Sequence, residues 1–115
     1  ATTWNAQAGG DGAKSKYVES ILIDDATGEI TITYDPTNIG AIPAASTLVL
    51  TPYINGSDAA SAAALEQLGA SFAAGVTGQV DWGCASATNT VGAARNLPPL
   101  TAGSLPARFA PSECR

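Results

Sequence analysis

Two cysteines, Cys84 and Cys114, are the side chains whose chemistry and position are most informative in this chain. They are the only cysteines, and the second lies one residue from the C-terminus. A disulfide has most to stabilise at a terminus that would otherwise fray. The position therefore favours a bond that closes residues 84–114 into a loop, at roughly 3–4 kcal/mol in the chain-entropy model. The alternative is two buried free thiols. A closed, irregular loop holds a recognition or contact surface and does no catalysis.

Catalytic groups are scarce in the sequence. The chain has no histidine, which removes the usual general base, the commonest metal ligand and every Ser-His or Cys-His pair. The Lys-Ser-Lys run at 14–16 has no supporting group around it, and Asp81 beside Trp82 is the one residue that suggests a glycosidase-like carboxylate pair. We therefore predict a protein that is not an enzyme and needs no cofactor.

The charge is low and acidic, with ten Asp and Glu against five Lys and Arg. Without a basic run there is no footprint for nucleic-acid binding through phosphates. Asp24, Asp25 and Glu29 surround a predicted turn and could bind a hard cation, but their spacing lacks the ordered ligand pattern of a calcium loop. We expect a solvated turn there and no metal site.

The segments that must hold the loop in place are predicted to form one domain with a small sheet. A chain of 115 residues favours a single domain. Alternating apolar residues, turn signals and strand formers predict four short strands, the first two joined as a hairpin. Pro52 places the end of the third strand at an edge or a bulge. The predicted strands are 17–23, 29–34, 47–54 and 79–84.

The other segments are predicted from capping and breaking residues. A helix over 58–74 would start at Ser57 or Asp58 and stop at Gly75, so that 57–75 forms a helical insertion. Residues 1–16 read as a loop pinned by Trp4, residues 35–45 as a connection, and everything after Ala85 as loops and tight turns without a fifth strand.

This reading leaves one face of the sheet without a cover. A small antiparallel sheet has an apolar face that another layer must bury. The predicted helix is a poor cover because its apolar stripe, Leu65, Leu68 and Phe72, is narrow. No apolar run near 18 residues is present, and we read the chain, which starts with Ala1, as processed or truncated.

Several runs of residues resemble the globular head of type IV pilins. The Trp-Gly-Cys at 82–84 resembles the Trp-x-Cys that ends their last sheet strand, and the Phe-Ala-Pro-Ser-Glu-Cys at 109–114 resembles their closing aromatic-x-Pro-x-x-Cys motif. The run 105–108 precedes it, and 16–21 with 28–34 resembles their first hairpin. Together the similarity covers about residues 14–54 and 79–115.

The resemblance implies an α+β pilin head with a four-stranded antiparallel sheet. It also implies a long apolar N-terminal helix, which anchors the subunit in the inner membrane before assembly and covers the sheet. The apolar start of such a helix is not found in this sequence, which would explain the missing layer. The implied partners are other copies of the pilin in a helical filament and the pilus assembly machinery. The implied location is the extracellular, cell-surface pilus, serving adhesion, twitching motility, biofilm formation and DNA uptake.

By the same resemblance, the loop between the cysteines would contact a host-cell receptor or glycan and neighbouring subunits. Three arginines in the C-terminal half, Arg95, Arg108 and Arg115, could pair with acidic residues of a neighbour, although isolated solvated charges are the expectation for each. The candidate contact residues are Arg95, Leu97, Pro98, Pro99, Leu105, Pro106, Arg108, Phe109 and Pro111.

Two other readings stay open. The first is a minor pilin or a secretion-system pseudopilin, which has the same head, although pseudopilins usually lack the terminal disulfide loop. The second is a secreted carbohydrate-binding β-rich domain that uses Trp4 and Trp82.

Overall fold

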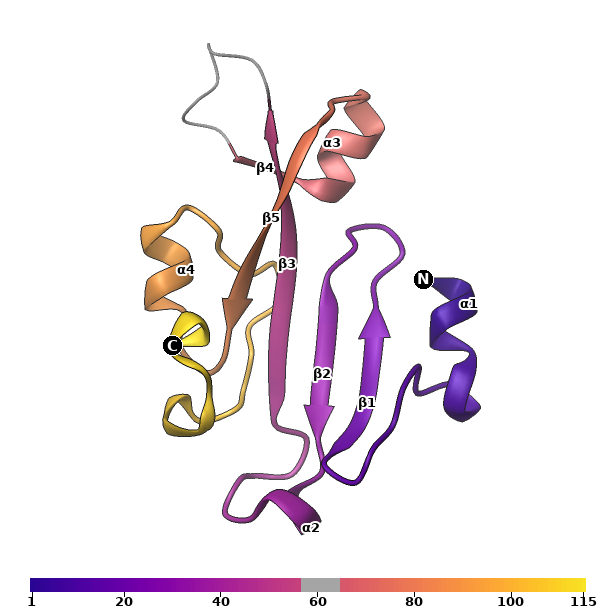
Figure 1. Cartoon of the computed structure of the whole chain (residues 1–115), viewed down its shortest axis with the longest axis vertical. Coiled ribbons are helices and arrows are strands. Elements are labelled where there is room, and N and C mark those ends of the chain that lie inside the picture. Colours follow the sequence, from indigo (N-terminus) through magenta and orange to yellow (C-terminus); the bar gives the residue numbers. More distant parts are fainter. Residues whose placement is uncertain (57–64) are drawn as a thin grey trace.

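An antiparallel sheet forms the centre of the molecule, with short helices around it (Figure 1). The computed structural model describes residues 1–56 and 65–115. The strand order is β1-β2-β3-β4, and β5 pairs with β3 on its other side. The α+β class and the antiparallel sheet are confirmed. The sheet has a fifth, three-residue strand beyond the four predicted. The strands are β1 Val18–Ile23, β2 Ile30–Tyr34, β3 Thr47–Gly56, β4 Leu65–Gln67 and β5 Gly78–Ala85.

The predicted hairpin is present, and its turn is ordered by Asp24. The Asp24 carboxylate accepts hydrogen bonds from the Ala26 amide at 3.0 Å, the Thr27 amide at 2.8 Å and the Thr27 hydroxyl at 2.9 Å. These bonds lower the pKa of Asp24, the Thr27 hydroxyl most of all. Gly28 then takes a φ of +76°, a conformation that side chains disfavour. This local chemistry places Ile30 at the start of β2.

Strand β3 is the central strand, and Pro52 lies inside it. Strand β2 pairs with the first part of one edge of β3, up to Leu50, and β4 pairs with the same edge from Tyr53 onward. Strand β5 pairs with the opposite edge from Val49 to Gly56. The prediction that Pro52 marks a sheet edge or a bulge is therefore corrected: it lies at the gap between β2 and β4, where its missing N–H leaves no ladder bond unmade.

The register gives the sheet two unlike faces. Cross-strand partners lie on the same face of a sheet, so the pairings Ile21–Ile32–Leu48 and Ile30–Leu50–Cys84 define one face, which we call the apolar face. Its members on β1, β2, β3 and β5 are Ile21, Ile23, Ile30, Ile32, Tyr34, Leu48, Leu50, Pro52, Ile54, Val80, Trp82 and Cys84. The opposite face has Thr31, Val49, Thr51, Tyr53 and Gly83, which are smaller or more polar.

One end of the apolar face is covered, and Pro52 and Ile54 along β3 are buried as well. A buried cluster, against which Ile32 and Tyr34 pack, covers that end; its members are Ile42, Leu48, Leu105, Ala110 and Cys114. Toward the other end Val80 remains 48% exposed and Trp82 43% exposed. The part of this face on β5 therefore lacks a covering layer, as the sequence predicts.

The outer edge of the sheet, along β1, is closed by the N-terminal segment. The prediction of a loop over 1–16 is wrong, since helix α1, Thr2–Asn5, and the 3₁₀ turn η1, Gln7–Gly9, form there. The Trp4 indole N–H donates to the Ile21 carbonyl at 2.8 Å, as the predicted pin. The Asn5 amide donates to the Ile23 carbonyl at 2.7 Å and accepts from the Ile23 N–H at 2.9 Å. These side chains satisfy backbone groups that would otherwise template strand pairing with another molecule.

The predicted helix over 58–74 is confirmed in part. Residues 57–64 lie outside the described residues, the prediction is wrong over 65–67, which form β4, and Leu68–Ala74 is helical, as α3. Pairing of Gln67 with Tyr53 extends the chain there, and the Gln67 side chain caps α3 by accepting from the Gly69 N–H at 2.8 Å. Leu65 is therefore not on the helix, and Phe72 is 85% exposed. Gly75 ends α3 in the left-handed conformation, as predicted.

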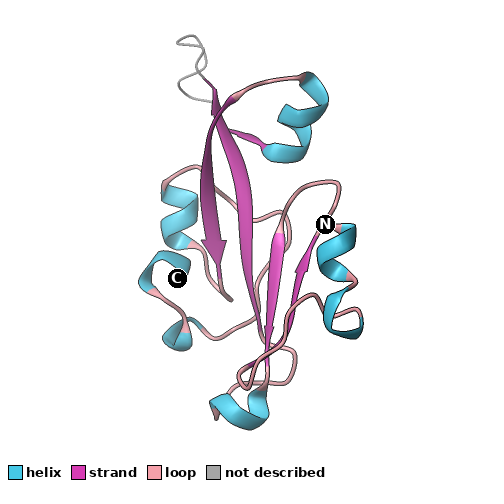
Figure 2. Ribbon diagram, turned by 45° about the vertical axis from the view of Figure 1, so that its right-hand side comes forward, coloured by secondary structure: helices cyan, strands magenta, loops and turns pink. Residues whose placement is uncertain are grey.

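Short helices also interrupt the segments predicted to be irregular. Helix α2, Pro36–Ile39, lies within the 35–45 connection, and the Asp35 side chain caps it at the Thr37 N–H, 2.8 Å away. After Ala85 the chain forms α4, Thr90–Ala94, and the 3₁₀ turns η3, Ala107–Phe109, and η4, Ser112–Cys114. In Figure 2 α4 and η4 lie beside β5, where the chain ends. None of the described helices has the length and apolarity to cross a membrane.

Candidate functional site: the disulfide-bounded loop

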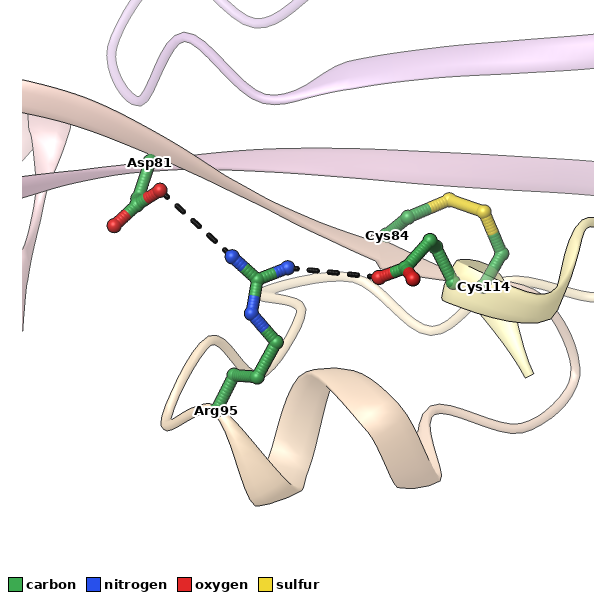
Figure 3. A network of polar contacts seen from close by, with 5 residues as sticks. Asp81, Cys84, Arg95 and Cys114 are labelled. Atoms are coloured by element: carbon green, nitrogen blue, oxygen red, sulfur yellow. Dashed lines mark ion pairs between the residues drawn. A yellow bond between two sulfur atoms is a disulfide. The ribbon is translucent and has the colours of Figure 1, made fainter.

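The two cysteines are joined in the structure. Cys84, near the end of β5, bonds to Cys114 in η4, with their Cα atoms 4.6 Å apart (Figure 3). Cys114 is buried, and its carbonyl accepts from the Ser86 N–H at 2.8 Å. The predicted disulfide is confirmed, and both cysteines are in it. The bond and this hydrogen bond together fix the tail against the free edge of β5.

Arg95 lies between two acidic side chains beside the disulfide (Figure 3). Its guanidinium is 3.8 Å from the Asp81 carboxylate on β5 and 3.7 Å from the Glu113 carboxylate on η4. All three side chains are about half exposed or more, so each pair stabilises the fold only slightly. Arg95 therefore pairs within its own chain, where the sequence suggested a neighbouring subunit or solvent.

Residues 97–101, which we call the strap, cross the sheet face opposite the apolar face. Leu97 is fully buried over Gly83, whose missing side chain makes room: a β-carbon there would lie 2.8 Å from the Leu97 β-carbon. The Tyr53 hydroxyl on β3 donates to the Pro98 carbonyl. Burial and, secondarily, the nearby Glu29 carboxylate raise the pKa of Tyr53, so the phenol keeps its proton.

The far end of the strap is held by Glu29, just before β2. Its carboxylate is buried and accepts from the backbone N–H groups of Leu100 at 2.9 Å and Thr101 at 3.2 Å, and from the Thr51 hydroxyl at 2.6 Å. The strap thus runs from β5, over β3, to the start of β2. The sequence predicts a solvated turn around Glu29 and does not indicate that Tyr53 or Gly83 contacts the loop.

The predicted contact residues divide by exposure. Leu97 and Leu105 are 1% and 3% exposed and belong to the core, which corrects the prediction that they are contact residues. Pro99 and Pro106 are partly exposed. The exposed set is Arg95, Pro98, Arg108, Phe109 and Pro111.

Arg108 and Phe109 form one exposed unit on η3. The Arg108 guanidinium lies over the Phe109 ring, 4.8 Å from its centroid, and Phe109 is 43% exposed. Such stacking joins a cation to an aromatic surface. Arg115 instead turns back and donates from Nε to the Ala110 carbonyl at 3.0 Å. The surface that the loop offers is therefore aromatic and cationic at η3.

The other sequence candidates do not form sites. Asp24 caps its turn and Glu29 is buried beneath the strap, so these carboxylates do not converge with Asp25 on a cation. Within 1–56 and 65–115, no group of three or more acidic or cysteine side chains could hold a metal ion. Trp4 lies along β1 and Trp82 lies on β5, three strand positions away, and so they share no stacking platform.

The comparison with known families agrees with this geometry. The family model for pilins, described as bacterial filament proteins, matches residues 1–115. The chain belongs to the pilin family. This pilin is also similar to the crystal structure of a type IV pilin from Pseudomonas aeruginosa (strain Pa110594), at 45% identity and a TM-score of 0.87. That alignment covers 99% of this chain and 74% of the other.

No curated protein matches this pilin significantly. The resemblance read from the cysteine motifs is confirmed by the family and the fold. Pilins are structural proteins that assemble with other copies into a filament on the cell surface, and the disulfide-bounded head described above is the part of such a subunit that this chain provides.

Proposed function

We propose that this pilin is the structural subunit of a type IV pilus and that a helix N-terminal to residue 1 packs on its apolar face. The observation that carries the proposal is the uncovered part of that face. Val80 and Trp82 on β5 are about half exposed there, and their partners on β3, Ile54 and Pro52, are buried. Ile30 and Leu50 on the same face are partly exposed. A contiguous apolar surface of this kind on a small head needs a partner.

The same geometry favours a definite orientation in the filament. If the apolar face packs inward on a helix, the strap on the opposite face points outward. The exposed Arg108–Phe109 unit at the edge of the head remains accessible as well. The disulfide-bounded loop would then form part of the filament surface, which supports a role in adhesion to a host-cell receptor or glycan.

The remaining roles follow from the filament as a whole. We propose that twitching motility, biofilm formation and DNA uptake depend on assembly and retraction by the pilus machinery, with no catalysis by the head. The five Lys and Arg residues of the chain argue against direct DNA binding by this domain. The disulfide loop favours a pilin over a secretion-system pseudopilin.

Assembly is tested by expressing the full-length gene in a bacterium that lacks its own major pilin. Trp82→Glu puts a charge on the apolar face and is expected to lower the amount of sheared filament about tenfold or more, because a buried unpaired charge costs several kcal/mol. Leu100→Glu is the matched control, since Leu100 is 53% exposed but lies in the strap. Equal yields from the two variants, both with folded heads, would contradict the proposal.

Adhesion is tested separately with the head alone as a competitor of intact pili on host cells. The parent head should inhibit attachment, and Arg108→Ala with Phe109→Ala should inhibit far less. Phe72→Ala, which removes an exposed aromatic side chain outside the loop, should inhibit like the parent. If all three heads compete equally, η3 does not carry recognition.

A further inference from the structure

Glu29 is the one buried acidic side chain among the described residues, at 5% exposure. Its Oε2 atom accepts three hydrogen bonds: from the Thr51 hydroxyl, the Leu100 N–H and the Thr101 N–H. Within the described part of the chain, no lysine or arginine pairs with it. A buried carboxylate is costly unless it is hydrogen-bonded, so this charge depends on the three neutral donors.

The three donors come from two parts of the chain that are far apart in sequence. Thr51 belongs to the rigid centre of β3, whereas Leu100 and Thr101 belong to the strap, 71 and 72 residues from Glu29. The hairpin turn fixes Glu29 itself, because its N–H donates to the Thr27 hydroxyl at 3.2 Å and its carbonyl accepts from the Asp24 N–H at 2.8 Å. The carboxylate is therefore an anchor on the sheet, and the strap is what it holds.

Two further contacts hold the strap on the same face. The Tyr53 hydroxyl donates to the Pro98 carbonyl, and Leu97 fills the space over Gly83. All of these contacts involve residues 97–101, whereas the disulfide acts at 84 and 114, the two ends of the loop. The tail near the disulfide has its own hydrogen bond, from Ser86 to Cys114. The loop thus has two separate sets of restraints.

We propose that Glu29 is a positioning residue for the exposed tip of the strap, Pro98 to Leu100. In this arrangement Glu29 and Tyr53 set the shape of the tip, and the disulfide sets only the return of the tail to β5. Leu100 is 53% exposed, so the shape that Glu29 imposes is presented to solvent. Glu29 sets the conformation of the tip whether or not the tip binds a receptor.

The test is amide hydrogen exchange, followed by NMR, on the head. Glu29→Gln replaces a charged acceptor with an amide, and the Leu100 and Thr101 amides should exchange about tenfold faster or more. The Leu105 amide, bonded to the Thr47 carbonyl, and the Ser86 amide should be unchanged. Glu113→Gln is the matched control, because it removes one exposed carboxylate from the same loop and should alter neither strap amide.

Reducing the disulfide supplies the reciprocal measurement. The Ser86 amide should then exchange faster, while Leu100 and Thr101 keep their protection. The proposal is overturned if folded Glu29→Gln leaves both strap amides unchanged, or if reduction alone releases them. Should Glu29→Gln not fold, Glu29→Asp decides, because it keeps the charge but shortens the reach to the Leu100 and Thr101 amides: faster exchange at both in a folded head supports the proposal, and unchanged exchange overturns it.

Discussion

Leu97 packs so closely on Gly83 that a β-carbon at position 83 would approach the Leu97 β-carbon to 2.8 Å and also meet its carbonyl oxygen. Gly83 lies in β5 beside Cys84, and its backbone is buried. This contact is where the strap begins to cross the sheet. It explains why a glycine occupies the middle of the motif at 82–84, a strand position where glycine is otherwise unfavourable.

Gly83→Ala should therefore displace the strap or strain β5, and lower the free energy of unfolding by about 1–3 kcal/mol. Gly92→Ala is the graded control. The nearest atom to its added carbon would be the Leu97 carbonyl oxygen at 3.1 Å, and helix α4 would gain up to about 1 kcal/mol in propensity. Urea denaturation should show a clear loss for the first variant and little change for the second. A Gly83→Ala head as stable as the parent would refute the close packing.

Replacing both cysteines with serine should lower the free energy of unfolding by roughly 3–4 kcal/mol, since the bond closes a loop with a sequence separation of 30. Denaturation of the parent with and without reductant should show the same difference. Thiol titration of the unreduced, unfolded parent should find no free thiol. Two titratable thiols before reduction would contradict the disulfide.

Asn5→Ala should expose the Ile23 N–H and carbonyl at the β1 edge and reduce stability by about 1–2 kcal/mol. Asn5→Asp keeps the oxygen that accepts from the Ile23 N–H but loses the donor to the Ile23 carbonyl. The stability of this variant should therefore lie between those of the alanine variant and the parent. Hydrogen exchange of the Ile23 amide gives a local readout beside denaturation. If the alanine variant matches the parent in both, Asn5 does not close this edge.

Tyr53 should make stability fall at alkaline pH. Its folded pKa is raised by burial and by Glu29, so the neutral phenol is favoured in the folded state. The contribution is complete below the unfolded pKa of about 10 and is lost as pH rises through the higher folded pKa. Tyr53→Phe should flatten the decline above about pH 10, with a residual slope from Tyr34, whose pKa burial also raises. Superimposable pH profiles for parent and variant would count against this contribution.

The parts of the fold that the sequence predicts well are those set by local chemistry. The alternation of Ile30, Ile32 and Tyr34 locates β2, the turn residues locate the hairpin, and Gly75 marks a helix end. The cysteine motifs locate the loop. The helix prediction fails over 65–67 because a contact distant in sequence decides the structure there. Pairing with β3 overrides the helical preference of the alanine-rich segment.

The contacts that hold the disulfide-bounded loop could not be predicted from the sequence, for a related reason. Glu29 follows Asp24 and Asp25 at the end of a turn, which indicates a solvated position, and only the fold brings Leu100 and Thr101 above it. Likewise Leu97 and Leu105 lie among prolines that indicate an exposed segment, yet both are buried against distant strands. A glutamate directly before the alternating Ile30, Ile32 and Tyr34, and inside the predicted strand 29–34, is the one signal that could have pointed to a buried carboxylate.

We expect the apolar face to be buried in the assembled pilus and the disulfide-bounded loop to remain exposed. Hydroxyl-radical footprinting of the head and of intact filaments tests this directly, with Trp82 and Phe109 as reporters because both are 43% exposed in the head. Modification of Trp82 should fall several-fold in filaments while that of Phe109 stays the same. Undiminished modification of Trp82, or protection of Phe109 alone, would contradict it.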